Sequence, residues 1–178
     1  MNLVLIGYRG TGKTTVARHL ARALAWDWVD CDVEVELRAG RSIATIFADG
    51  GESAFRDWES IVLAELIHRD RTVIAAGGGM VVRPDNRQLL ATAGLVVWLT
   101  AHVDTIQTRL AADDVTASQR PILLAGGEDE IRQLLTARTP LYRACAAFEV
   151  VTDDRSPDEV AAEILSRGNL SNCGQEGK

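Results

Sequence analysis

The chain has 178 residues, of which 47% are hydrophobic and 25% are charged, and its formal net charge is −6. This length fits a single domain, and the apolar fraction is too high for a disordered chain. No apolar stretch approaches the ~20 residues that cross a bilayer, and the acidic balance argues against a nucleic-acid partner.

The cysteines and the first residues indicate the compartment. Cys31, Cys145 and Cys173 are widely spaced and form no C-x-x-C pair, so neither a disulfide framework nor a zinc site is indicated. Residues 1–7 lack a basic lead-in and are typical of a buried strand rather than a signal peptide. We therefore expect a cytoplasmic protein with no membrane partner.

Short apolar runs alternate with helical patterns along the whole chain. In chain order we expect a strand at Leu3–Ile6, a helix at Thr14–Ala25, a strand ending at Trp28 and Val29, helices at Val33–Ala39 and Ser42–Arg69, a strand at Thr72–Ala76, a helix from Pro84 that stops at Gly94, a strand at Leu95–Leu99, a helix at Val103–Ala111, a strand at Phe148–Val151 and a helix at Pro157–Ser166. Ser42 and Ser53 are candidate N-caps. Five strands separated by helices predict an α/β fold, with an open parallel sheet that binds ligands beyond the carboxyl ends of its strands.

Two polar segments stand apart from this pattern. Residues 113–127 form a long, glycine-bearing connection, which is typical of a lid or of a disordered loop, and residues 168–178 are predicted to be a frayed tail.

The first strand leads into a phosphate-binding motif. Gly7-Tyr8-Arg9-Gly10-Thr11-Gly12-Lys13-Thr14 matches G-x-x-x-x-G-K-[ST] and opens a helix, which is the context that this motif requires. Glycines let backbone N–H groups surround phosphate oxygens, and the helix N-terminus adds positive potential. Lys13 is the one lysine besides the terminal Lys178, among seventeen arginines. It is predicted to reach the β- and γ-phosphates, and the Thr14 hydroxyl to bind Mg²⁺.

Asp30-x-Asp32 follows the second strand. One carboxylate can serve the Mg²⁺ shell while the other meets a substrate hydroxyl. A helix N-cap is the alternative, since aspartate before a helix satisfies free N–H groups. The neighbouring phosphate loop favours the functional interpretation.

Four further motifs contribute charged side chains or exposed backbone groups. Arg56 and Glu59 lie one helical turn apart and can form an ordinary surface ion pair. Gly77-Gly78-Gly79 can offer backbone N–H groups to a ligand, or can be a flexible loop. Arg138, in Arg-x-Pro-Leu-Tyr, is expected near a helix end, where complementing the dipole is the default role. Arg120-Pro121 lies in the polar segment, from which an arginine can swing onto a transferring phosphoryl group.

Together these motifs resemble the shikimate kinase family. The likeness covers nearly all of the body, and the motifs that carry it are the phosphate loop, Asp30–Asp32, Gly40–Ile43 (G-R-S-I), Gly51–Arg56 (G-E-x-x-F-R), Gly77–Gly79, Arg120–Pro121 and Arg138–Tyr142 (R-x-P-L-Y). The resemblance implies a single three-layer α/β/α P-loop kinase domain over residues 1–167. It further implies a five-stranded parallel sheet in the order 2-3-1-4-5, a substrate-binding part at about residues 32–62 and a mobile lid at about 113–127.

The resemblance also implies an activity and residue roles. The enzyme would be a monomer that transfers the γ-phosphoryl group of ATP to the 3-hydroxyl of shikimate, with Mg²⁺ as cofactor. Catalytic roles fall to Asp32, Lys13 and Arg120, substrate binding to Asp32, Arg56, Gly78, Gly79 and Arg138, and metal binding to Thr14 and, through water, Asp30. The nucleotide contacts would be Gly10, Thr11, Gly12, Lys13, Thr14, Thr15, Arg109, Arg120 and Arg155.

Two alternatives remain at this point. A related small P-loop kinase, acting on gluconate or a nucleotide, shares the loop and much of the fold. A nucleotide-binding switch that transfers nothing shares the loop alone, but it would not need Asp32, Arg120 or a lid. The chain also departs from the family pattern, with Ile122 in the lid motif, Cys31 between the aspartates and no carboxylate at Ala75-Ala76.

Overall fold

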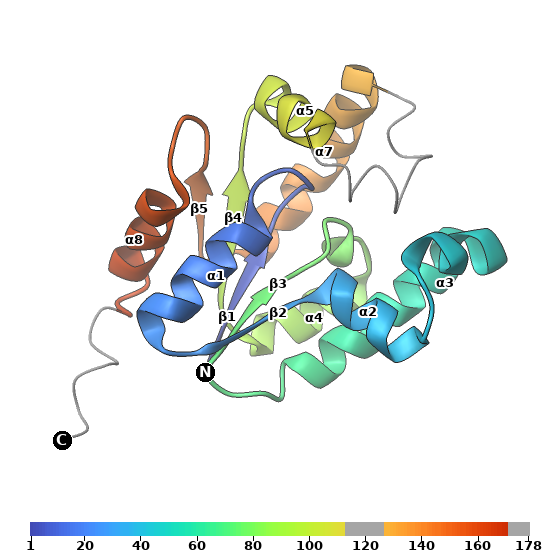
Figure 1. Ribbon diagram of the computed structural model, residues 1–178, viewed down its shortest axis with the longest axis horizontal. Helices are drawn as coiled ribbons and strands as arrows, with labels where there is room; N and C mark the ends of the chain where they lie inside the picture. The colour runs from blue at the N-terminus through green and yellow to red at the C-terminus, as the bar shows by residue number, and fades with distance from the viewer. Residues whose placement is uncertain (113–126, 171–178) are drawn as a thin grey trace.

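The computed structural model describes residues 1–112 and 127–170 of the chain (Figure 1). Its centre is one parallel sheet with the strand order β2-β3-β1-β4-β5. The strands are β1 (Asn2–Ile6), β2 (Asp27–Asp30), β3 (Thr72–Ala75), β4 (Gly94–Thr100) and β5 (Phe148–Val151). The helices are α1 (Lys13–Leu24), α2 (Cys31–Ala39), α3 (Ile43–Leu66), the 3₁₀ helix η1 (Met80–Val82), α4 (Pro84–Thr92), α5 (Val103–Ala111), α7 (Gly127–Cys145) and α8 (Pro157–Arg167).

The central strand β1 is buried on both faces, as its unbroken apolar run predicts. Leu3 and Leu5 pack with residues of α1 and α8, whereas Val4 and Ile6 pack with residues of α2, α3, α4 and α7. The alternation of side chains along a strand thus sorts the helices into two layers, one on each face of the sheet (Figure 1). The predicted three-layer α/β/α fold and its strand order are confirmed.

The strand register sets the carboxyl-terminal edge of the sheet, where the functional motifs follow. Asp30 pairs with Ala75, and Ile6 pairs with Trp98. The phosphate loop after β1, the aspartates after β2 and the glycines after β3 therefore leave the sheet side by side. No helix in residues 1–112 or 127–170 is both long and apolar enough to cross a membrane.

Two of three local predictions are confirmed. The helix α4 ends at Thr92 with Ala93 as its C-cap, so Gly94 (φ 118°) directly follows the helix end as predicted; it also opens β4, where a β-carbon would overlap the backbone of Asn2. Ser42 does cap α3 by accepting from the N–H of Thr45, but Ser53 lies inside α3, and the irregular backbone falls at Gly51 instead.

The two carboxyl-terminal boundaries also differ from the prediction. Arg138 lies well within α7, which continues past Pro140 to Cys145, so it does not end a helix. Residues 168–170, assigned to the tail, belong to the fold, because Leu170 is 4% exposed and packs with α8 and β4 residues. Gly127 begins α7, and the rest of the expected lid and tail lies outside the described residues.

Candidate active site

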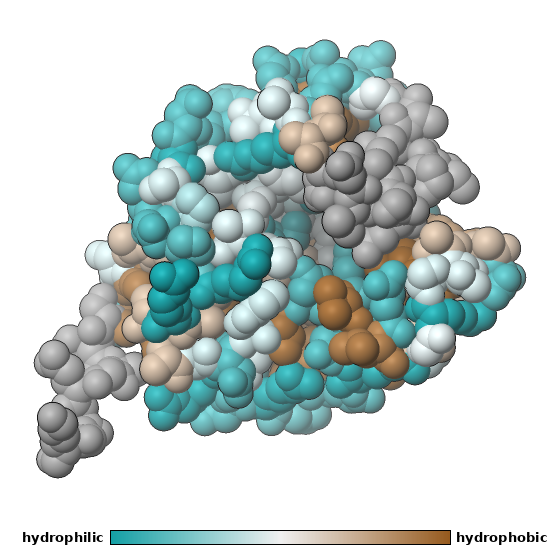
Figure 2. Space-filling model, viewed as in Figure 1, coloured by the Kyte–Doolittle hydropathy of each residue, from teal (hydrophilic) through white to brown (hydrophobic). Residues whose placement is uncertain are grey.

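The phosphate loop and the segments beside it line a cleft of about 770 Å³ at the carboxyl-terminal edge of the sheet. Figure 2 shows this cleft as a recess on the viewed face, above α1. All six loop and helix residues predicted to bind nucleotide line it, namely Gly10, Thr11, Gly12, Lys13, Thr14 and Thr15. Asp30, Asp32, Gly77, Gly78, Arg109 and Arg155 line it as well.

The loop backbone is shaped for an anion. Gly12 caps α1 in the left-handed conformation (φ 87°), which glycine adopts without steric cost. The cap makes no side-chain hydrogen bond, and the first turn of α1 holds no acidic residue. The helix N-terminus therefore keeps N–H groups and positive potential for a phosphate.

Side chains at the loop are already positioned by hydrogen bonds. The Lys13 Nζ donates to the carbonyl of Tyr8 at 2.8 Å, which folds the lysine back over the loop. The Thr14 hydroxyl donates to Asp30 Oδ2 at 2.5 Å, and Asp30 Oδ1 accepts from the N–H of Asp32 at 2.9 Å. Asp30 is thus the N-cap of α2 and a cleft residue at once, so its two interpretations are compatible.

Cys31 and Asp32 diverge at the start of α2. Asp32 lines the cleft, whereas Cys31 is fully buried in the core on the other side. Burial raises the pKa of the Cys31 thiol, and the nearby carboxylates of Asp30, Asp32 and Glu59 raise it further. The thiol is therefore a neutral core group at physiological pH.

The triple glycine is packed too closely to be a flexible loop. A β-carbon at Gly77 would overlap Glu59 and lie 3.1 Å from Asp32 Oδ1, and one at Gly79 would overlap the guanidinium of Arg56. At Gly78 it would lie 3.2 Å from the backbone nitrogen of Arg9 in the phosphate loop. Glycine is required here for close approach, and these contacts join the acidic, basic and phosphate-binding segments.

Arg56 is buried rather than part of a surface ion pair. It is 8% exposed and is paired with Glu59, which is fully buried, and with Glu52, whose Oε1 lies 2.7 Å from Nη2. Burial by itself lowers the pKa of Arg56, but Glu59 and Glu52 together raise the pKa above its usual value, so the residue stays cationic. A buried cation beside Gly79 is suited to holding an anionic ligand.

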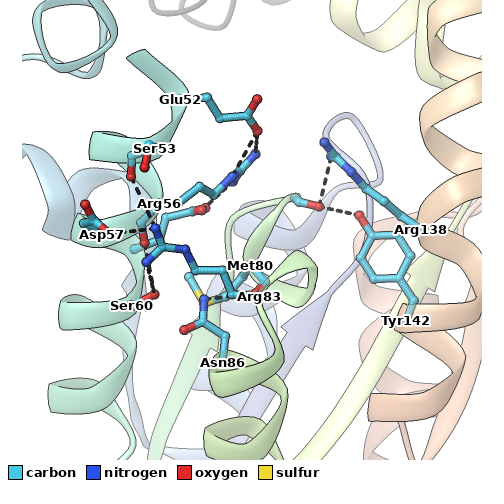
Figure 3. Close-up of polar contacts among 12 residues, drawn as sticks. Glu52, Ser53, Arg56, Asp57, Ser60, Met80, Arg83, Asn86, Arg138 and Tyr142 are labelled. Atoms are coloured by element: carbon cyan, nitrogen blue, oxygen red, sulfur yellow. Dashed lines mark hydrogen bonds and ion pairs between the residues drawn. The ribbon is translucent and has the colours of Figure 1, made fainter. Parts of the chain in front are cut away.

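Arg138 reaches the same glycine loop from α7 on the opposite side (Figure 3). Its Nη1 donates to the carbonyl of Gly78 at 3.3 Å, its guanidinium lies 6.0 Å from the ring centre of Tyr8, and the Tyr142 hydroxyl also donates to Gly78. Arg56, Gly79 and Arg138 are not among the residues that line the main cleft. They lie where it ends, beyond Gly77 and Gly78.

Arg109 and Arg155, which were expected to contact the nucleotide, also line the cleft. Arg109 donates to the carbonyl of Gly10 (3.2 Å) and to both oxygens of Thr152, while Arg155 pairs with Glu163 at 2.6 Å. Both are thus fixed by protein contacts. Arg120, the predicted lid arginine, lies outside the described residues.

Several residues that line the cleft were not predicted from the sequence. They come from three helices and from the segment after β5, and they are Arg18, Val33, Val160 and Thr152. Thr152 directly follows β5 at the edge where ligands bind, which was a usable signal. Arg18 and Val160 are ordinary helix residues, and the sequence carries no mark of their placement.

The fold and the cleft together define the class of protein to which this chain belongs. A parallel sheet in the order 2-3-1-4-5, with a phosphate loop after the central strand and aspartates after its edge strand, is the architecture of a P-loop kinase for small molecules. The family model described as shikimate kinase matches residues 9–168. The chain belongs to the shikimate kinase family, whose members are ATP-dependent kinases.

Individual relatives agree with this assignment. A shikimate kinase from Rhodopirellula baltica is 44% identical over 92% of this chain and 88% of the relative. The solved structure of shikimate kinase from Acinetobacter baumannii in complex with shikimate has a TM-score of 0.88 and 38% identity, covering 98% of this chain and 95% of that one. A gluconokinase from Sinorhizobium meliloti, at 14% identity and TM-score 0.57 over 95% of this chain and 91% of that one, shares the fold alone.

Proposed function

We propose that this protein transfers the γ-phosphoryl group of ATP to the 3-hydroxyl of shikimate. The observation that carries the proposal is the placement of Asp32 in the same cleft as Lys13, next to a glycine loop flanked by Arg56 and Arg138. A triphosphate on the phosphate loop would end near Asp32. A small acid with its carboxylate between the two arginines would present its alcohol there.

The acceptor hydroxyl oxygen attacks the γ-phosphorus, and the bond from that phosphorus to the leaving oxygen of ADP breaks. Asp32 orients the hydroxyl and takes up its proton. Lys13 neutralises charge on the β- and γ-phosphates, and Arg120 in the lid segment would add a second cation at the γ-phosphate, where one arginine contributes about 10³–10⁵ in rate. Gly78 and Gly79 supply backbone N–H groups to the carboxylate.

The charge balance supports local binding of both anions. The chain carries a net charge of −6, which disfavours the approach of ATP and of a carboxylic acid. Lys13 in α1 and Arg138 in α7 provide local positive charge, and Arg56 in α3 provides guanidinium donors although Glu52 and Glu59 offset its charge. A planar guanidinium also selects for a carboxylate through paired hydrogen bonds.

The residues present fit Mg²⁺ as cofactor. The Thr14 hydroxyl donates its hydrogen bond to Asp30, which leaves the lone pairs of the Thr14 oxygen available to a hard cation. In the described part of the chain no three acidic, histidine or cysteine side chains gather as a metal site, so Thr14 would bind the ion together with water and phosphate oxygens, and Asp30 would act through water. Bound Mg²⁺ would neutralise charge on the phosphates.

A coupled assay of ADP release tests the proposal. Purified protein with ATP, Mg²⁺ and shikimate should release ADP far above the rate with ATP alone, and a rate equal to that background would refute the activity. Gluconate and nucleoside monophosphates in the same assay identify the rival kinases. Titration calorimetry addresses the nucleotide-binding switch, which would bind ATP and ignore shikimate.

We also propose that the protein works as a cytoplasmic monomer, with residues 1–170 as one domain and residues 113–126 as a lid. Gel filtration with light scattering checks the oligomeric state. Protease sensitivity of the lid segment with and without both substrates checks its closure.

A further inference from the structure

Arg56 has two carboxylate partners in very different surroundings. Glu59 is fully buried, whereas the Glu52 side chain is 63% exposed. Figure 3 shows Glu52 reaching back over the Arg56 guanidinium, across from Arg138. The same cation therefore holds one carboxylate inside the protein and one at its surface.

The exposed partner occupies a particular edge of the guanidinium. Arg56 Nε and Nη2 both donate to Glu52 Oε1, at 3.1 Å and 2.7 Å. Parallel N–H groups on this edge are the ones with which arginine binds a carboxylate in a bidentate manner. A carboxylate of the protein itself thus takes up donors that an acidic ligand would use.

Glu52 can move without moving Arg56. It follows Gly51, whose backbone (φ 67°, ψ −167°) interrupts the helical conformation inside α3, and a β-carbon at Gly51 would meet no atom within 4 Å. Arg56 is fixed from two other directions, by buried Glu59 and by contact with Gly79. The exposed Arg56–Glu52 pair is therefore the contact in which a ligand carboxylate can replace a protein carboxylate.

We propose that Glu52 is an internal competitor for the acceptor's carboxylate, which must displace it from Arg56. Two carboxylates, Glu52 and Glu59, already share the single cation of Arg56, so a third carboxylate on this guanidinium is disfavoured while Glu52 stays in place. When the carboxylate of the acceptor takes the place of Glu52, the number of carboxylates on Arg56 is unchanged. An acceptor without a carboxylate cannot make the exchange, so Glu52 sets acceptor selectivity as well as affinity. The inference rests on the proposed function of this site.

The size of the effect follows from the exposure of the pair. An exposed ion pair of this kind favours the closed contact over the open one by about twofold to fivefold. The apparent dissociation constant of the acceptor rises by the inverse of the competent fraction. Removing the competition should therefore tighten acceptor binding by about threefold to sixfold.

Calorimetric titration of shikimate into the full-length protein, without nucleotide, tests this. Glu52→Gln keeps the shape and an acceptor oxygen but removes the charge, and it should bind shikimate about threefold to sixfold more tightly than the original chain. Asp57→Asn is the matched control, because Asp57 is equally exposed on the same helix but pairs with Arg83. It should leave binding nearly unchanged. Equal affinities of the two variants, or weaker binding by Glu52→Gln, would overturn the inference.

The carboxamide of shikimate separates this competition from a change in the shape or flexibility of the site, whereas Asp57→Asn controls for the loss of one negative charge. The carboxamide should gain nothing from Glu52→Gln, because it has no carboxylate to exchange, and an equal gain for acid and amide would contradict the inference. Failure of the original chain to bind shikimate at all would instead refute the proposed function and, with it, this inference. Binding by the original chain with no gain in Glu52→Gln refutes the inference alone.

Discussion

Gly79→Ala is the substitution that most sharply tests how the acceptor site is built. A β-carbon at position 79 would overlap the Nη1, Cζ and Nη2 atoms of Arg56, all of them closer than real β-carbons come to another atom. Ordinary contact needs about 3.5 Å, so the guanidinium must retreat by on the order of 1 Å. Glu59 is fully buried on one side of Arg56, so this movement breaks or stretches charge-assisted hydrogen bonds.

Loss of one such bond costs about 1.5–3 kcal/mol, which corresponds to about tenfold to a hundredfold in affinity. Gly79→Ala should therefore raise the KM for shikimate by about that factor in the coupled assay and leave the KM for ATP nearly unchanged. Gly78→Ala is the comparison, because its β-carbon would meet the Arg9 backbone at 3.2 Å and not Arg56. An unchanged shikimate KM in Gly79→Ala would refute the packing of Arg56 against this loop.

The other predictions concern single side chains. Lys13→Ala and Asp32→Ala should abolish turnover while circular dichroism stays that of the folded protein, and a normal rate from Asp32→Ala would remove that residue from the mechanism. Arg138→Ala should raise the shikimate KM more than it lowers kcat in the coupled assay, and the reverse pattern would argue for a role in the chemical step. Cys31 should resist alkylation at pH 8 until denaturant is added, because burial raises the pKa of its thiol; peptide mass mapping checks this, and rapid labelling of the native protein would contradict the burial. Burial raises the pKa of Tyr142 to about 12, so the Tyr142 hydroxyl loses its proton at a lower pH in the unfolded chain than in the folded protein. The free energy of unfolding, measured by urea titration, should therefore fall between about pH 10 and pH 12. Tyr142→Phe should flatten this fall, and a pH profile identical to that of the original chain would count against the explanation.

The sequence was sufficient to predict the sheet and the phosphate loop because both depend on local patterns. An apolar run, a glycine-rich loop and an amphipathic helix follow one another directly from β1 into α1, and the motif fixes what the backbone must do. The role of Asp30 was harder to predict, since an aspartate that caps a helix and one that serves the Mg²⁺ shell have the same sequence signature. The structure shows that one carboxylate has an oxygen for each of its two neighbours.

The packing of the acceptor site could not be predicted in this way. Spacing indicated that Arg56 and Glu59 can pair, but it did not indicate that Glu59 is buried, because the glycine that covers it belongs to the loop after β3. Glu52 carried no signal beyond its place in a motif. Glu52 directly follows Gly51, whose backbone is not helical, whereas helical periodicity predicts a regular helix through this position.

A crystal structure of the protein with shikimate and ADP tests the central claim most directly. The account predicts the acid's carboxylate within hydrogen-bonding distance of the guanidinium groups at positions 56 and 138, and its 3-hydroxyl beside the Asp32 carboxylate on the side of Lys13. A ligand bound with its ring reversed, or seated away from the glycine loop, would contradict the idea that these distant segments form one acceptor pocket.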